Sequence, residues 1–92
     1  MLVEHDASRH RFFVALPEGE GELVYTVVAP HLLDLQHTGV DPAVQHHGVA
    51  DALAQAALEF ARREDDRVIP TCPYVRNWLT RHPEYHDLVA PG

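Results

Sequence analysis

His37-Thr38-Gly39-Val40-Asp41-Pro42-Ala43-Val44-Gln45-His46-His47-Gly48-Val49-Ala50 is the stretch that decides the fold of this chain. It predicts the end of a strand, a short polar turn, a glycine-bearing loop and the start of the longest helix. Such a junction leaves several backbone N–H groups unpaired at the positive end of the helix dipole. A phosphate or pyrophosphate fits there without help from lysine or arginine. The stretch therefore predicts a site for a nucleotide-type ligand.

Upstream of this stretch the hydrophobic pattern has a period of two, which is typical of β-strands. Residues 11–16 and 22–29 are rich in aromatic and β-branched types,. Short polar breaks separate the runs, among them the turn at residues 17–21, where Gly19 and Gly21 are able to adopt positive φ angles. Such short connections predict an antiparallel meander. The four expected strands are residues 2–5, 11–16, 22–29 and 32–38.

Two of these strands carry a prediction about their faces. The run 22–29 is apolar at both parities. We therefore expect it to be covered on both faces or to lie centrally in the sheet. In the run 32–38, strict alternation places Leu33, Leu35 and His37 on one face and Asp34, Gln36 and Thr38 on the other,.

Downstream, the period changes from two to 3.6, which predicts an amphipathic helix. Its apolar stripe is Val49, Leu53, Ala56 and Phe60, widened by Ala57 and Leu58,. The helix is expected to end at residues 62–64, and Asp65 and Asp66 then form a turn. Residues 67–70 predict a brief fifth strand, which a right-handed crossover would pair in parallel with 32–38.

A second helix is expected over residues 74–82, with Val75, Trp78 and Leu79 as its buried stripe and Pro83 as its end,. The tail 84–89 should dock on the body through its apolar side chains. The predicted fold class is therefore α+β, in a single domain of residues 1–92. Its parts are an antiparallel four-strand meander, a long crossover helix, a parallel fifth strand and a short C-terminal helix.

Composition limits the possible partners. The chain has 92 residues and a formal net charge of −7, which disfavours nucleic acid because phosphate backbones are bound through clustered lysine and arginine. No apolar run approaches the roughly 20 residues needed to span a bilayer. The first residues lack a basic and apolar leader pattern, and the single cysteine fits a reducing compartment, so a cytoplasmic location is expected,. With one cysteine and no His-x-x-x-His on a helix, no metal site is expected.

Cys72 stands at a second helix start. Pro73 suits the first helical position, which makes Cys72 the expected cap residue,. The helix dipole would favour its thiolate and make it reactive. A buried, inert cysteine is an equally good interpretation of the same pattern.

Three motifs together resemble a known family. They are His37-Thr38-x-Val40, then Gln45-x-x-Gly48-x-Ala50, and finally Val68-Ile69-Pro70-x-Cys72-Pro73-Tyr74-Val75 followed by Arg81-His82-Pro83-Glu84-Tyr85. In order and spacing they are similar to the minimal single-domain branch of the GNAT N-acetyltransferases. The resemblance covers roughly residues 12–89.

The resemblance implies an acetyl-CoA site without a metal. Pantetheine would lie between the splayed fourth and fifth strands, beside residues 37–40, and the pyrophosphate would lie on the amides of residues 45–50. Cys72 would lie near the acetyl thioester as the candidate catalytic group, and His37 is the second candidate, although a histidine on a strand face is often only a packing residue. The cofactor-binding candidates are Thr38, Val40, Gln45, His46, His47, Gly48, Val49 and Ala50.

The implied activity is transfer of an acetyl group from acetyl-CoA to a primary amine, on a small molecule or a protein lysine. Either the amine attacks directly, with His37 or a water as base, or a Cys72 thiolate takes the acetyl group first. The alternative is a CoA-binding or acetyl-carrier module of the same fold, because little chain remains for an acceptor pocket. A monomer or weak homodimer is expected.

Two positions depart from the family pattern. Gly39 stands where an acidic residue is usual, and His46 and His47 stand where basic or small residues are common. Phosphate contact would then rest on amides, aided by partly protonated histidines. We therefore expect affinity for CoA to fall as pH rises.

Overall fold

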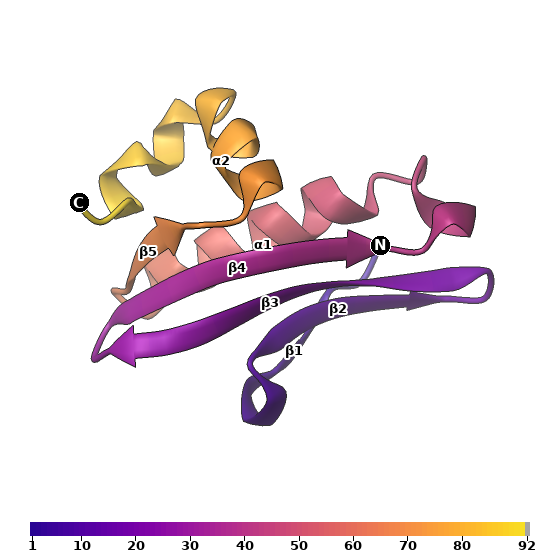
Figure 1. Cartoon of the computed structure of the whole chain (residues 1–92), viewed down its shortest axis with the longest axis horizontal. Coiled ribbons are helices and arrows are strands. Elements are labelled where there is room, and N and C mark those ends of the chain that lie inside the picture. The colour runs from indigo at the N-terminus through magenta and orange to yellow at the C-terminus, as the bar shows by residue number, and fades with distance from the viewer. Residues whose placement is uncertain (92) are drawn as a thin grey trace.

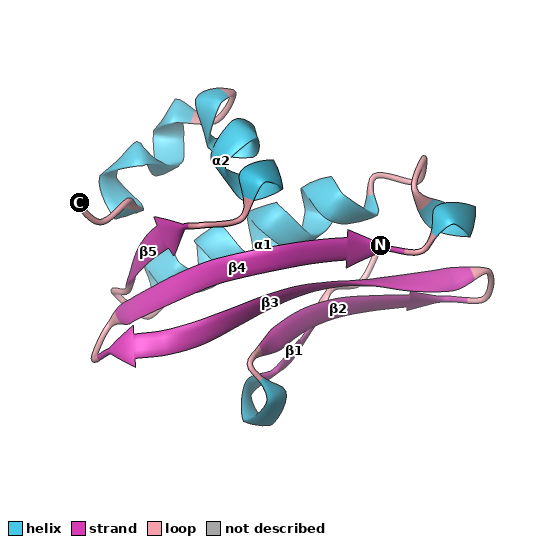
Figure 2. Cartoon of the chain, viewed as in Figure 1, coloured by secondary structure: helices cyan, strands magenta, loops and turns pink. Residues whose placement is uncertain are grey.

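Five strands form one sheet in the order β1-β2-β3-β4-β5 (Figure 2). The computed structural model describes residues 1–91. Strands β1 to β4 pair antiparallel with their neighbours, and β5 pairs in parallel with β4. The predicted α+β class is confirmed. The strands are β1 (Glu4–Asp6), β2 (Arg11–Leu16), β3 (Gly19–Ala29), β4 (Leu32–Val40) and β5 (Arg67–Pro70).

Two α-helices accompany the sheet, α1 (Val49–Arg63) and α2 (Pro73–Thr80). Helix α1 makes the crossover from β4 to β5 and lies behind the sheet in Figure 1. Short 3₁₀ helices span Ala7–Arg9, Pro42–Val44 and Pro83–Leu88. Within residues 1–91, no helix has the length and apolar character needed to cross a membrane.

The core lies between α1 and one face of the sheet. Because α1 repeats every 3.6 residues, its apolar stripe turns towards the sheet and the charged residues turn outward. Of the predicted stripe, Val49 and Leu53 are buried, while Ala56 and Phe60 are half-buried at its edge. The core-facing residues are Phe12, Val14, Leu23, Tyr25, Leu33, Leu35 and Val68 on the sheet and Val49, Leu53, Ala54, Ala57, Leu58 and Ala61 on α1.

Strand β3 is apolar at both parities, for which we expected either a central place in the sheet or cover on both faces. Strand β3 does lie in the middle of the sheet. Cover on both faces is wrong, because Figure 1 shows α1 behind the sheet and no helix in front of β3, and the outward-facing Val28 is half exposed. The outward-facing Val24 therefore lies between its cross-strand partners Arg11 and His37 rather than under a second layer,.

Several helices and strands begin or end at other residues than the sequence predicts. Strand β1 begins at Glu4 instead of residue 2, and β3 already begins at Gly19, so the turn shrinks to Pro17 and Glu18. Helix α2 ends at Thr80, two residues early, and the tail forms the 3₁₀ helix Pro83–Leu88. Beyond it, Val89 bridges to Val68 on the free edge of β5.

The positive φ angles expected at Gly19 and Gly21 are wrong, because both residues belong to β3. Among the described residues, Gly48 is the glycine with a positive φ angle. Gly21 is required for another reason. A Cβ atom at Gly21 would lie 2.6 Å from Cγ1 of Val49. The first residue of α1 therefore packs directly on bare backbone of β3.

Substituting Gly21→Ala should lower the free energy of unfolding by about 1–3 kcal/mol, the usual cost of overpacking a filled core. Gly39→Ala is the matched control, since a Cβ there would meet only the end of the exposed His37 side chain, at 3.2 Å. Urea denaturation of both variants measures the effect. Equal stability of the two variants would show that Val49 does not need the glycine.

At the opposite end of the sheet, His31 joins two turns. Its Nδ1 lies 2.8 Å from Oδ1 of the nearly buried Asp66, and its carbonyl accepts a hydrogen bond from the Arg67 N–H at 2.8 Å. Asp65 takes the left-handed conformation expected of this turn, with φ of 57°. The hydrogen bond to Asp66, followed by the charge of Asp66, raises the pKa of His31 above its ordinary 6.5.

The raised pKa of His31 predicts a pH-dependent stability. Its contribution is complete below the unfolded-state pKa near 6.5 and is lost as pH rises through the higher folded-state pKa,. The stability gap between the wild type and His31→Asn should therefore be largest near about pH 5.5 and shrink by about pH 8.5. Asparagine suits the control because it tolerates the positive φ of 60° at this position,. Chemical denaturation across this range checks the prediction, and a gap that widens with pH would contradict it.

Candidate functional site

Strands β4 and β5 separate halfway along β4. Their pairing runs from Leu32–Arg67 to Leu35–Pro70. The Cys72 N–H then donates to the Leu35 carbonyl at 2.8 Å, and the chain turns into α2. Within residues 1–91, the stretch from His37 to Val40 pairs with β3 on one side and with no strand on the other. An extended ligand can hydrogen-bond to such an edge.

A β-bulge interrupts β4 at the same place. Leu35 lies opposite Tyr25 and His37 lies opposite Val24, so Gln36 has no partner of its own. An extra residue of this kind reverses the in-and-out alternation of the strand. The predicted face assignment after residue 35 is therefore wrong.

The bulge brings Thr38, and not His37, to the helix-covered face. Thr38 lies opposite the buried Leu23, and its Oγ1 is 3.5 Å from Sγ of Cys72. His37 is exposed on the opposite face, beside Gly39. The two candidate catalytic residues are thus not brought together by the fold. The sequence carries one sign of this reversal, because the apolar residues of the strand change from the odd-numbered Leu33 and Leu35 to the even-numbered Val40.

The start of α1 presents free backbone donors. Gly48 is its cap residue with φ of 75°, and no side chain caps the helix. Ala52 is the first residue whose N–H bonds back, to the Gly48 carbonyl at 3.1 Å. A Cβ at Gly48 would meet nothing within 4 Å, so the left-handed conformation, and not crowding by the protein, favours glycine,.

A cavity of about 380 Å³ lies between the free edge of β4, this loop and α2. Five of the predicted site residues lie around it. His47 is exposed outside it, and the Val49 side chain is fully buried in the core, so that residue could offer a ligand only its N–H. The lining residues are Thr38, Val40, Gln45, His46, Ala50 and Tyr74.

Tyr74 is the lining residue that the sequence analysis did not assign. It sits one residue after Pro73, in the first turn of α2. Burial, and then the charge of Asp51, raise the pKa of its phenol above 10.0. The hydroxyl therefore stays protonated at neutral pH and can donate a hydrogen bond. Its place beside Cys72 in the motif was the signal available in the sequence.

Cys72 is the cap residue of α2, as predicted, and Pro73 occupies the first turn. Its side chain makes no capping hydrogen bond and is only 2% exposed. Sγ has the Thr38 hydroxyl as its polar neighbour. Because Thr38 lines the cavity and Cys72 does not, the thiol lies behind the cavity wall.

A cavity of about 370 Å³ lies between α2 and the C-terminal segment, and it contains none of the predicted site residues. Among residues 1–91, no three His, Cys, Asp or Glu side chains gather closely enough to hold a metal ion.

Comparison with known proteins identifies relatives of the chain and a solved structure with the same fold. A model of the GCN5-related N-acetyl-transferase family matches residues 11–88. Protein NATD1 from Bos taurus is 40% identical over 93 residues, covering 97% of this chain and 82% of its own, and the Homo sapiens protein of the same name is 39% identical. The NMR structure of a GCN5-like protein from Staphylococcus aureus superposes with a TM-score of 0.74 at 21% identity, over 99% of this chain and 89% of that one, and shows the same fold.

Proposed function

This chain belongs to the GCN5-related N-acetyltransferase family, and we propose that it transfers an acetyl group from acetyl-CoA to a primary amine. The acceptor would be a small molecule or a protein lysine, and residues 1–92 would act as one domain. The observation that carries the proposal is the cavity where the free edge of β4 meets the uncapped start of α1.

The residues around this cavity fit the two halves of the cosubstrate. The N–H groups of Gly48, Val49 and Ala50 suit a pyrophosphate, which helix N-termini bind through backbone donors and dipole. The edge of β4 from Thr38 to Val40 suits the amide-bearing pantetheine arm, as an added strand would. Acetyl-CoA supplies an acetyl group already activated as a thioester.

In the direct route, the acceptor amine attacks the thioester carbonyl, and free backbone N–H groups at the β4 edge stabilise the oxyanion. A proton lost by the amine passes to His37 or to a water that it holds. Because His37 lies on the open face of the sheet, opposite the helices, the acceptor amine would approach from that face. The protonated Tyr74 hydroxyl on the cavity wall can give a proton to the departing sulfur,.

In the alternative route, the Cys72 thiolate attacks the same carbonyl, the bond to the CoA sulfur breaks, and the amine then takes the acetyl group from Cys72. This route requires Thr38 to move aside, because Cys72 is only 2% exposed and its Sγ lies behind Thr38. His37 lies on the other face and cannot act as its base. The geometry therefore favours direct attack.

We expect the purified chain to release CoA from acetyl-CoA in the presence of at least one primary amine, with the product identified by intact mass. Cys72→Ser, which keeps the size of the buried side chain, should retain turnover within a few-fold if attack is direct. His37→Ala should lower kcat/KM by about 10²-fold, the low end for a general base.

Other outcomes of the same experiment change the proposal. A Cys72 acetyl adduct that chases into amine, with turnover lost in Cys72→Ser, would replace direct attack by the two-step route. Tight CoA binding without product would favour a binding or acetyl-carrier module. No CoA binding at millimolar concentration would overturn the whole proposal.

The loop of the site also predicts a pH dependence. His46 and His47 are the only side chains of residues 45–50 that can become cationic. Because protonated histidine attracts phosphate, CoA affinity should fall between roughly pH 6 and 8, where histidine titrates. Calorimetric titration of the wild type and His46→Gln/His47→Gln should show the slope and its loss. His31→Asn, at the far end of the sheet, is the control, and a flat wild-type profile would remove the histidines from phosphate binding.

A further inference from the structure

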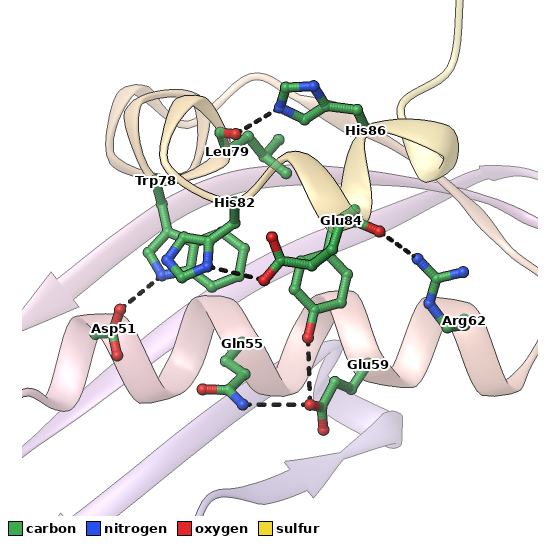
Figure 3. A network of polar contacts seen from close by, with 10 residues as sticks. Asp51, Gln55, Glu59, Arg62, Trp78, Leu79, His82, Glu84 and His86 are labelled. Atoms are coloured by element: carbon green, nitrogen blue, oxygen red, sulfur yellow. Dashed lines mark hydrogen bonds and ion pairs between the residues drawn. The ribbon is translucent and has the colours of Figure 1, made fainter.

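Asp51 lies in the first turn of α1, three residues after the cap residue Gly48. Its carboxylate Oδ1 accepts a hydrogen bond from Nε1 of Trp78 on α2, at 2.7 Å (Figure 3). The Trp78 side chain is 0% exposed. This contact joins α1, which follows the loop, to α2, whose cap residue is Cys72.

An acidic side chain at this position usually has a different partner. The third residue of a helix commonly reaches back to the N–H of the cap residue and closes the helix end. A carboxylate is also attracted to the positive end of the helix dipole. In this chain no side chain caps α1. The one carboxylate placed to do so is held by α2 instead.

Trp78 holds that carboxylate in a fixed position. The indole has a single N–H donor, which in a buried site requires a partner. Its ring stacks on His82 with centroids 3.8 Å apart, and His82 Nδ1 lies 3.3 Å from Glu84 Oε2 (Figure 3). Tyr85 contacts the same indole, with ring centroids 5.5 Å apart. The C-terminal segment therefore fixes the direction in which the indole N–H points.

We propose that Trp78 is a positioning residue that withdraws Asp51 from its own helix end, so that the amides of Gly48, Val49 and Ala50 stay open to phosphate. This inference rests on the proposed binding of CoA. A released Asp51 would act as an internal anion that competes with the ligand for the same donors. The effect should fall on the pyrophosphate half of the ligand alone.

The first test needs no ligand. Trp78→Phe removes the N–H donor but keeps an aromatic ring in the core. In this variant the freed carboxylate should bond to the loop amides. Amide hydrogen exchange followed by NMR should then slow at Gly48 relative to the wild type, and Trp78→Phe/Asp51→Asn should restore fast exchange.

The second test compares two ligands, CoA and pantetheine, which lacks the pyrophosphate. Trp78→Phe should weaken CoA binding by about 3- to 10-fold, the scale of a helix-cap interaction, and leave pantetheine binding unchanged. Asp51→Asn alone keeps an oxygen acceptor for Trp78 and removes a negative charge, so CoA should bind more tightly. The double variant should recover the affinity lost in Trp78→Phe.

The chain offers a matched control. Tyr85 donates to Oε1 of Glu59 at 3.3 Å, which is also a contact from an aromatic residue to a carboxylate of α1. Glu59 lies two turns further along, about 12 Å from Asp51 along the helix axis. Tyr85→Phe should therefore leave CoA affinity unchanged, and thermal unfolding of each variant reports any loss of stability.

The outcomes separate this inference from the proposed function. A wild-type chain that binds no CoA would overturn the proposed function. Unchanged exchange at Gly48 in Trp78→Phe would overturn the inference, whether or not CoA binds. Equal loss of CoA and pantetheine affinity, without rescue by Asp51→Asn, would also overturn it, because Trp78 would then support only the general packing.

Discussion

The parallel pairing of β4 and β5 ends where the Cys72 N–H bonds to the Leu35 carbonyl, and the geometry of the site follows from that limit. A fifth strand of only four residues leaves the second half of β4 with one unpaired edge. Pro73 then starts α2 at once, so β5 cannot continue beside β4,. The same turn places Cys72 beside Thr38. The shortness of β5 therefore accounts both for the unpaired edge of β4 and for the position of the Cys72 thiol beside it.

Periodicity predicted most of the fold because each element carries its own local signal. The change from a period of two to 3.6 at residue 49 located α1, and Pro73 located the start of α2. The bulge at Gln36 could not be seen in the same way. It is set by pairing with β3, and strict alternation assumes that no residue is inserted. That single residue reversed the expected faces of His37 and Thr38.

The candidate site shows the same division between local and long-range information. The residues of the loop and of the end of β4 are contiguous in sequence, and five of those predicted do line one cavity. The contact between Asp51 and Trp78 joins residues 27 positions apart and depends on how α2 docks on α1. Gly21 is a similar case, since its need for glycine comes from Val49, a residue of another element. Sequence patterns give no register between elements of this kind.

No side chain caps the start of α1, and glycine at the cap position costs roughly a few tenths of a kcal/mol of stability,, so packing contacts help to hold the first turn of α1 in place. Val49 does this with its side chain, which is 0% exposed and packs on the bare backbone of Gly21. Its N–H meanwhile points away from the core, because the N–H groups of a first helical turn lie along the helix axis. The side chain of Val49 therefore anchors the helix in the core, while its backbone N–H faces away from the core. Anchoring by packing rather than by a cap leaves the first N–H groups of α1 without a side-chain partner.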